Sequence, residues 1–348
     1  MALHEKSTIG PGVARMLESN LGLKSGERLL VLTDVPRMAE WRGENGTQMR
    51  EMLDRALLAR AVAELAAEQF EDCAVAFRPF ASTGRDGSEP SPAVAKWAAV
   101  ADAVVALTTY SLSHTRARER ATACGARFAS LPGFDEEMLR PGGPLAIDTN
   151  AMAADCRRMA EQLSGANCAT VTSEAGTQLS LRLEGRTGRA DTGDLRAVGS
   201  WGNLPGGEAY IAPLEGSASG RAVVPVGWFP GLEDELELVF GDGEVQEIRG
   251  GGAVGAWLQD LLRPGDSRSR FRNRRNVAEL GIGGNPGARL PLNVLESEKI
   301  MGTVHVAIGD SSHIGGQVAA DLHADFVLPD VNLEFDGELV IGGGVWLM

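Results

Sequence analysis

The sequence predicts an α/β protein in two parts: a parallel-sheet α/β domain over residues 1–165, then a β-rich α+β domain over residues 166–348. Three observations support this. Through the first half, short apolar runs alternate with helical patterns, which is typical of a parallel sheet with helices on its faces. After residue 165, short alternating runs are separated by glycine turns, which is typical of antiparallel hairpins. The chain of 348 residues is also long enough to bury two cores.

The first part alternates strand and helix in order. We expect strands at residues 26–34, 73–80, 102–109 and 127–133, and helices at residues 49–70, 91–101 and 115–126. In the long helix, one face carries the apolar side chains Leu53, Leu57, Leu58, Ala61, Val62 and Leu65, with arginine and glutamate opposite. This periodicity predicts that the apolar face covers the sheet.

Two polar segments fall where ligand groups sit in such sheets, beyond the carboxyl ends of the strands. The first is the long loop at residues 34–48, in which Trp41 is expected to anchor the loop, with a wall of a substrate pocket as the alternative. The second precedes a helix. There Ser113 and Thr115 are expected to cap the helix, and His114 is a candidate for contacting a substrate anion.

The second part begins after a helix expected at residues 150–165. Antiparallel strands are expected within residues 168–188, 207–224 and 235–250, and one helix at residues 252–265. Its glycine-rich segments, such as "GIGGNPGA", fit neither the phosphate-loop pattern nor a strand-to-helix dinucleotide motif. We interpret them as turns and places of close backbone approach.

Composition excludes several classes of partner. The formal charge of −14 and the pI near 4.9 oppose binding to nucleic acid or to an anionic membrane. The basic run at residues 268–275 is expected to be a solvated turn. The N-terminus has no apolar leader and no stretch has the apolar length of a membrane span, so we expect a cytoplasmic protein. Four cysteines without CxxC spacing predict neither a zinc ribbon nor a disulfide framework.

Three of the five histidines lie between residues 305 and 323. In "GTVHVAIGD", a strand would point His305 away from the valines, and in "LHADFVL" a strand would place His323 and Asp325 on one face. Neutral imidazole and carboxylate are ligands for zinc, manganese or iron. The alternative for an isolated His-x-Asp is a hydrogen-bonded pair within a partly buried sheet.

Two glutamates stand in apolar or glycine-rich surroundings, Glu208 in "GNLPGGEAYIAP" and Glu279 in "NVAELGIGGNPGA". A carboxylate in such a setting needs a cation or hydrogen-bond donors to offset its desolvation. Two glutamates, two histidines and an aspartate suit two adjacent divalent cations, a centre that activates water for hydrolysis. The second domain is therefore predicted to bind metal.

The four segments "GNLPGGEAYIAP", "NVAELGIGGNPGA", "VLESEKIMGTVHVAIGD" and "HADFVLPDVNLEFDGELV" resemble the aminopeptidase T and aminopeptidase S family of metallo-aminopeptidases. In the first half "GERLLVLTD" and "SLSHTRARERATACGARFASLPGF" resemble it too. The resemblance implies a homodimer that removes N-terminal residues from peptides, with two zinc, cobalt or manganese ions per chain. The motif positions imply five ligands: Glu208, Glu279, His305, His323 and Asp325.

The catalytic residues follow the family less closely. Either Glu208 or Glu279 is expected to bridge the metals, and Glu279 to take the proton from the attacking water. Where the family has a tyrosine, seven residues after His305, this chain has Ser312 followed by His313. His313 is a candidate donor to the oxyanion or a general acid, with a simple turn histidine as the alternative.

The sequence is also similar in layout to the 2,5-dihydroxypyridine 5,6-dioxygenases, which hold one iron(II) through two histidines and an aspartate. This chain keeps His323 and Asp325, but has Glu279 where the other histidine of those enzymes stands. The alternative function is thus a mononuclear iron(II) dioxygenase, with His305 as the second histidine, that cleaves a hydroxylated pyridine or aromatic ring. A third interpretation is an inactive relative that keeps the metal for stability. The first remains a hydrolase of a small amino-bearing molecule or short peptide.

Overall fold

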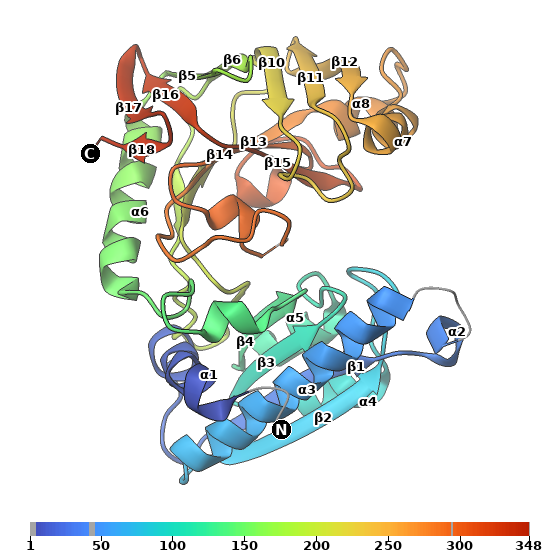
Figure 1. Ribbon diagram of the computed structural model, residues 1–348, viewed down its shortest axis with the longest axis vertical. Helices are drawn as coiled ribbons and strands as arrows, with labels where there is room; N and C mark the ends of the chain where they lie inside the picture. The colour runs from blue at the N-terminus through green and yellow to red at the C-terminus, as the bar shows by residue number, and fades with distance from the viewer. Residues whose placement is uncertain (1–4, 42–45, 294, 348) are drawn as a thin grey trace. The chain divides into compact units, whose positions relative to one another are not determined.

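The computed structural model describes residues 5–41, 46–293 and 295–347, and its elements are labelled in Figure 1. The predicted fold class is confirmed, with a parallel sheet first and antiparallel sheets after it. The chain forms two compact units, one of Met1–Thr149 with Gly193–Gly206 and one of Asn150–Thr192 with Gly207–Met348.

This division differs from the boundary expected at residues 165 and 166. Helix α6 (Thr149–Gly165) belongs almost wholly to the second unit, because its Met159 and Leu163 pack into that unit's core. Residues 193–206 return to the first unit, where strand β8 (Trp201–Gly202) pairs in parallel with β4 (Arg127–Pro132). Neither feature has a compositional signal in the sequence.

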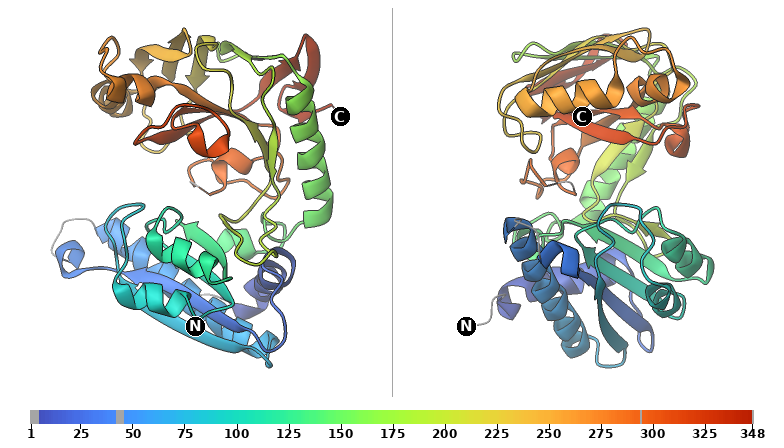
Figure 2. Two further views of the ribbon diagram at one scale, coloured as in Figure 1. Left: turned by 180° about the vertical axis from the view of Figure 1, so that it is seen from behind. Right: turned by 90° about the vertical axis from the view of Figure 1, so that its right-hand side faces the viewer.

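The first unit is a sheet with the strand order β2-β1-β3-β4-β8. Its long strands are β1 (Arg28–Val35), β2 (Ala74–Ala81), β3 (Ala103–Thr108) and β4. Helices α1 (Lys6–Arg15) and α3 (Gly46–Gln69) lie on one face, and α4 (Pro92–Ala98) and α5 (Arg116–Ala123) lie on the other (Figures 1 and 2). The remaining short elements are the π-helix η1 (Met16–Asn20), α2 (Met38–Trp41) and the 3-10 helix η2 (Glu136–Leu139).

The stripe that helix α3 buries overlaps the predicted one at Leu58, Val62 and Leu65 but is shifted from it. Leu53 and Leu57 are exposed, whereas the buried residues are Met52, Leu58, Ala59, Val62, Ala63, Leu65 and Ala66. The alanines in this stripe have no bulk beyond Cβ, so the helix backbone can approach the strands closely. The larger leucines on the neighbouring face remain outside the contact.

The second unit contains two antiparallel sheets. The larger has the order β12-β11-β10-β6-β5-β16-β17-β18, and the smaller has the order β15-β14-β13-β9-β7. The larger sheet consists of β5 (Cys168–Ser173), β6 (Gln178–Arg182), β10 (Ser219–Val224), β11 (Leu236–Gly241), β12 (Glu244–Gly250), β16 (Val331–Phe335), β17 (Glu338–Gly342) and β18 (Val345–Trp346). Side chains from both sheets form one core, which includes Val171, Leu238, Leu280 and Val306.

The smaller sheet consists of β7 (Arg189–Asp191), β9 (Glu208–Ile211), β13 (Val277–Gly283), β14 (Val304–Gly309) and β15 (His323–Leu328). Short 3-10 helices precede and follow β14, namely η3 (Ser297–Lys299) and η4 (Ser312–Ile314). Because one face of this sheet packs into the shared core, the alternating residues are presented on the opposite face.

Helices α7 (Gly252–Leu262) and α8 (Ser269–Arg275) complete the second unit. The basic run predicted to be a solvated turn is therefore wrong in part, because it forms α8 and buries two of its arginines. Arg274 pairs with Asp321 at 2.6 Å and Arg275 pairs with Glu244 at 3.1 Å, so each buried charge has a carboxylate partner. All four cysteines are free, and among the described residues no helix has the length and apolarity needed to cross a bilayer.

Candidate metal centre

The alternation of strand β14 separates its two faces as predicted. Val304, Val306 and Ile308 lie in the core of the second unit, and His305 is on the opposite face of the sheet. Strands β13 and β15 follow the same rule, since Leu280, Ile282 and Phe326 face the core. The face opposite the core therefore carries the polar residues of these strands.

The strand register brings the five predicted ligands to that face. Ala307 pairs with both Glu279 and Asp325, Gly281 pairs with His305, and Gly283 pairs with Glu208. In an antiparallel sheet, residues directly opposite each other point to the same side. His323, which pairs with Gly309, is two residues from Asp325 and shares its side.

The donor atoms form two triads that share Glu279. In the first triad, His305 Nε2 lies 3.4 Å from Glu208 Oε2 and 3.5 Å from Glu279 Oε1. In the second triad, His323 Nε2 lies 3.4 Å from Glu279 Oε2 and 3.6 Å from Asp325 Oδ1. Donor atoms that are each about 2.1 Å from one ion lie roughly 3–4 Å apart. In the second triad all three donor atoms lie within 4.8 Å of one another, and in the first triad Glu208 and His305 do so together with Glu298.

Glycine 281 makes room for the first triad. A Cβ atom at this position would lie 1.9 Å from His305 Nε2 and 2.1 Å from Cε1 of the same ring. The imidazole of His305 thus occupies the space directly over Gly281, on the strand next to its own. A side chain at residue 281 would displace the ring from between Glu208 and Glu279.

Several buried atoms of the first triad have no hydrogen-bond partner among the described residues. Glu208 Oε2 and both ring nitrogens of His305 are buried and make no hydrogen bond. Leaving such groups unpaired costs roughly 1–3 kcal/mol each. Glu208 Oε2 and His305 Nε2 face each other, and with a neutral histidine both atoms offer a lone pair. A cation between them would therefore give both buried atoms a partner.

The electrostatics of the protein without metal indicate a strongly negative site. Burial opposes protonation of His305, yet its contact with Glu279 and the charge of Glu208 raise its pKa to about 9. Burial likewise opposes protonation of His323, but Asp325 and Glu279 raise its pKa to about 12. Burial raises the pKa of Glu208 to about 8 against the opposing charge of Lys299. In the protein without metal, the negative charge of the carboxylates thus favours protonation of the neighbouring histidines. Bound divalent cations would balance the same charge.

Lys299 was not singled out by the sequence. Its side chain is buried, and Nζ lies 2.5 Å from Glu208 Oε1, 2.8 Å from Glu298 Oε1 and 3.8 Å from Asp191 Oδ2. Glu298 also offers an oxygen within reach of Glu208 and His305, as a further candidate ligand. The one available signal was "ESEK", a lysine just before an apolar strand, which is ordinarily a surface pattern.

Tyr210 is a second residue that sequence reasoning missed. It pairs with Gly281 and with Arg189, so its side chain is on the same face as His305. Burial, together with the negative charges of Glu208 and Asp191, raises the pKa of the Tyr210 phenol to about 12. Its spacing of two from Glu208 on a predicted strand was the signal that could have found it.

The loop after β14 supports the second triad. Asp310 accepts hydrogen bonds at its side chain from the Ser312 hydroxyl at 2.8 Å, and it pairs with His313 Nδ1 at 2.6 Å. Its carbonyl oxygen lies 2.8 Å from His323 Nδ1, which leaves His323 Nε2 facing the carboxylates. The His313 ring packs edge-on against the His323 ring, with centroids 5.0 Å apart. Ser312 therefore supports Asp310, while His313 stands beside a predicted ligand.

The remaining candidates belong to the first unit. The Trp41 indole donates a hydrogen bond to the Pro36 carbonyl at 3.2 Å, which agrees with its interpretation as a loop anchor. His114 is exposed and packs edge-on against Trp201, with ring centroids 5.7 Å apart. Thr115 caps α5 as predicted, since its side chain accepts a hydrogen bond from the Arg118 N–H.

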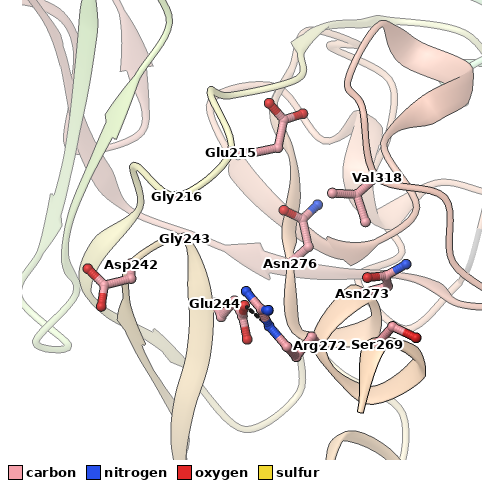
Figure 3. Close-up of a pocket in the computed structure, with 10 residues that line it drawn as sticks. All are labelled: Glu215, Gly216, Asp242, Gly243, Glu244, Ser269, Arg272, Asn273, Asn276 and Val318. Atoms are coloured by element: carbon pink, nitrogen blue, oxygen red, sulfur yellow. Dashed lines mark hydrogen bonds and ion pairs between the residues drawn. The ribbon is translucent and has the colours of Figure 1, made fainter. Parts of the chain in front are cut away.

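A cavity of about 290 Å³ lies elsewhere in the second unit and contains none of the five predicted ligands (Figure 3). Several of its polar side chains already have partners within the protein. Arg272 pairs with Glu244 at 3.1 Å, Asn273 donates to the Ala319 carbonyl, and Asn276 donates to the Gly309 carbonyl. Among the described residues, the two groups of potential metal ligands lie at the smaller sheet, with Glu298 of η3 beside them.

Comparisons with known proteins agree with both resemblances expected from the motifs. The family model for 2,5-dihydroxypyridine 5,6-dioxygenase, NicX, matches residues 23–347. The structure of 2,5-dihydroxypyridine dioxygenase from Pseudomonas putida KT2440 matches with a TM-score of 0.69 at 17% identity, over 99% of this chain and 98% of that chain. Wild-type AmpT from Thermus thermophilus matches with a TM-score of 0.65 at 14% identity, over 99% of this chain and 100% of that chain. No match was found among curated proteins.

Proposed function

The chain belongs to the 2,5-dihydroxypyridine 5,6-dioxygenase (NicX) family of enzymes, and we propose that within it this chain is a hydrolase of amide or peptide bonds. It is aminopeptidase-like and uses two divalent metal ions and an activated water. One observation carries the proposal: the two oxygens of Glu279 face two different histidines, His305 at 3.5 Å and His323 at 3.4 Å. A carboxylate in this position joins two cation sites.

The donor set of the second triad supports the same conclusion. It contains one histidine, His323, and two carboxylates, Glu279 and Asp325. Mononuclear iron(II) oxygenases are typically built on two histidines and one carboxylate. Carboxylate-rich triads with a shared glutamate suit zinc, cobalt or manganese in pairs, and such pairs generate hydroxide at neutral pH and polarise a carbonyl.

The residues of this chain supply the remaining steps. Glu279 would hold both ions, since its carboxylate lies between both triads with one oxygen toward each histidine. The Asp310 carbonyl fixes the orientation of the His323 ring, as a hydrogen-bonding partner behind a metal ligand does. The Asp310 carboxylate holds His313 Nδ1, so His313 Nε2 is available to donate a proton to the departing amine.

The substrate proposed is a short peptide or a small molecule with an amide bond. The formal charge of −14 disfavours nucleic acids and anionic membranes as partners. A homodimer, which the resemblance to aminopeptidase T and aminopeptidase S implies, completes the proposal, together with a cytoplasmic location.

Metal content tests the proposal most directly. Elemental mass spectrometry on protein purified without chelator or added metal should find about two zinc, cobalt or manganese ions per chain. The E279Q variant keeps the size of the side chain but not its charge, and should lose both turnover of aminoacyl amides and one metal equivalent. Unchanged turnover and metal content in E279Q contradict the proposal.

A second candidate function is the iron(II) ring-cleaving dioxygenase, and the family model over residues 23–347 favours it. His305, His323 and Asp325 would then be the ligands of a single iron, with open positions for substrate and oxygen. This function predicts about one iron per chain and oxygen uptake with a hydroxylated pyridine. It also predicts no hydrolysis of aminoacyl amides, which separates it from the first candidate.

A further inference from the structure

Lys299 is a buried cation that the hydrolytic mechanism does not use. Its ammonium contacts Glu208 Oε1 at 2.5 Å and Glu298 Oε1 at 2.8 Å, and only 3% of the residue is exposed. The lysine ends the short helix η3, whose backbone is held to the strand region by the hydrogen bond from the Asn285 N–H to the Lys299 carbonyl, at 2.9 Å. The position of the ammonium is therefore fixed by the fold.

We infer that Lys299 makes the two triads unequal, so that metal ions load in order, the second triad first and the first triad later and more weakly. The inference rests on the proposed two-metal function and concerns the affinity of each site. Lys299 acts here as a positioning residue, because it influences the metal through Glu208 and not by direct coordination.

The two triads differ in charge and in access. In the first, Lys299 holds Oε1 of Glu208, which leaves only Oε2 for a metal and places a positive charge on the same carboxylate. Among the described residues, no lysine or arginine forms an ion pair with the second triad, whose carboxylates pair with His305 and His323. A fixed like charge reduces the affinity of a cation, more so in a buried site.

Solvent exposure points the same way. The side chain of His305 is fully buried and that of Glu208 is 9% exposed, whereas His323 and Asp325 are 26% and 29% exposed. A cation entering from water reaches the second triad without displacing the Lys299 ion pairs. Filling the first triad requires it to compete with an ammonium for Glu208.

Titration of metal-free protein with cobalt(II), followed by visible absorption, tests this inference. The wild type should show two phases, the second weaker by about tenfold or more. K299M removes the charge of the side chain and keeps much of its length. It should lower the cobalt dissociation constant of the second phase by about tenfold and leave that of the first phase unchanged. K299R keeps the charge and should behave like the wild type. K96M, at an exposed lysine of the first unit, is the matched control.

Two results overturn the inference. One is a second phase in K299M that is unchanged from the wild type. The other is a K299R titration that resembles that of K299M, because the effect would then come from the shape of the side chain and not from its charge. Where K299M unfolds without metal, thermal unfolding replaces the titration, and cobalt should raise its melting temperature more than that of the wild type. An equal rise overturns the inference. A single phase in the wild type would contradict the proposed two-metal function. If K299M then shows a second phase, the result still supports the inference that Lys299 weakens metal binding at the first triad.

Discussion

Replacing Gly281 by alanine tests whether His305 is held in place by the open space over its neighbouring strand. The added Cβ would lie 1.9 Å from His305 Nε2, whereas ordinary contacts begin at 3.4 Å, so the ring must move by about 1.5 Å. Such overpacking costs roughly 1–3 kcal/mol of stability. The movement also takes Nε2 away from Glu208 and Glu279, which it now approaches at 3.4 and 3.5 Å.

The expected result for G281A is a folded protein of lower stability that binds one metal ion per chain instead of two. Chemical denaturation of the metal-free protein measures the first effect, and elemental analysis after dialysis against cobalt measures the second. G165A is the control, because a Cβ at Gly165 meets nothing within 4 Å. A G281A protein with two metals at wild-type affinity would refute the assignment of His305 to the centre.

Three other substitutions have defined outcomes. D310N should lower kcat by about tenfold or more, because His313 loses the carboxylate at its Nδ1. Both metals should be retained, because the backbone carbonyl of residue 310 still orients His323. Steady-state kinetics measures the first effect and elemental analysis the second. E279H should reduce the metal content to one ion and shift the preference toward iron(II), measurable by competition between metals. D34N should unfold at higher denaturant concentration than the wild type at pH 7. Burial raises the pKa of Asp34 above its ordinary value, so the folded state binds more protons than the unfolded state, and wild-type stability falls as pH rises from about 3.8 through the folded pKa. D34N should lack this dependence.

The elements and the facing of the histidines could be predicted because both depend on local periodicity, whereas the two glutamates were singled out by their apolar surroundings and by the family resemblance. The strand period of two predicts that His305 lies on the other face of its strand from Val304 and Val306, and that His323 and Asp325 share one face. This prediction needs no knowledge of how the strands pair. The strand order was not available in the same way. The closeness of Glu279 to both histidines comes from a register of three strands, which a single sequence does not specify.

The residues that sequence reasoning missed acquire their roles through tertiary contacts. Lys299 looks like a surface lysine in "ESEK", and only the packing of η3 against the smaller sheet brings it to Glu208. The return of residues 193–206 to the first unit likewise rests on tertiary contacts, among them the pairing of β8 with β4 and the hydrogen bond from the Leu195 N–H to the Asn20 carbonyl. The face of α3 shows the same limit, because Leu58, Val62 and Leu65 are buried as predicted while Leu57, which fits the same stripe, is exposed.

Under the proposed function, position 279 separates the two candidate chemistries. Its neighbours His305 and His323 each offer one nitrogen, and they stand on different strands with Glu279 on a third. A carboxylate there has two oxygens and can serve both sites, whereas an imidazole has one coordinating nitrogen on that side and can serve only one. With a glutamate the centre has two triads that share a ligand, and with a histidine it would have one triad of two histidines and an aspartate. Under the proposed function, exchanging this one residue would therefore separate a water-activating pair of metals from a single oxygen-activating iron.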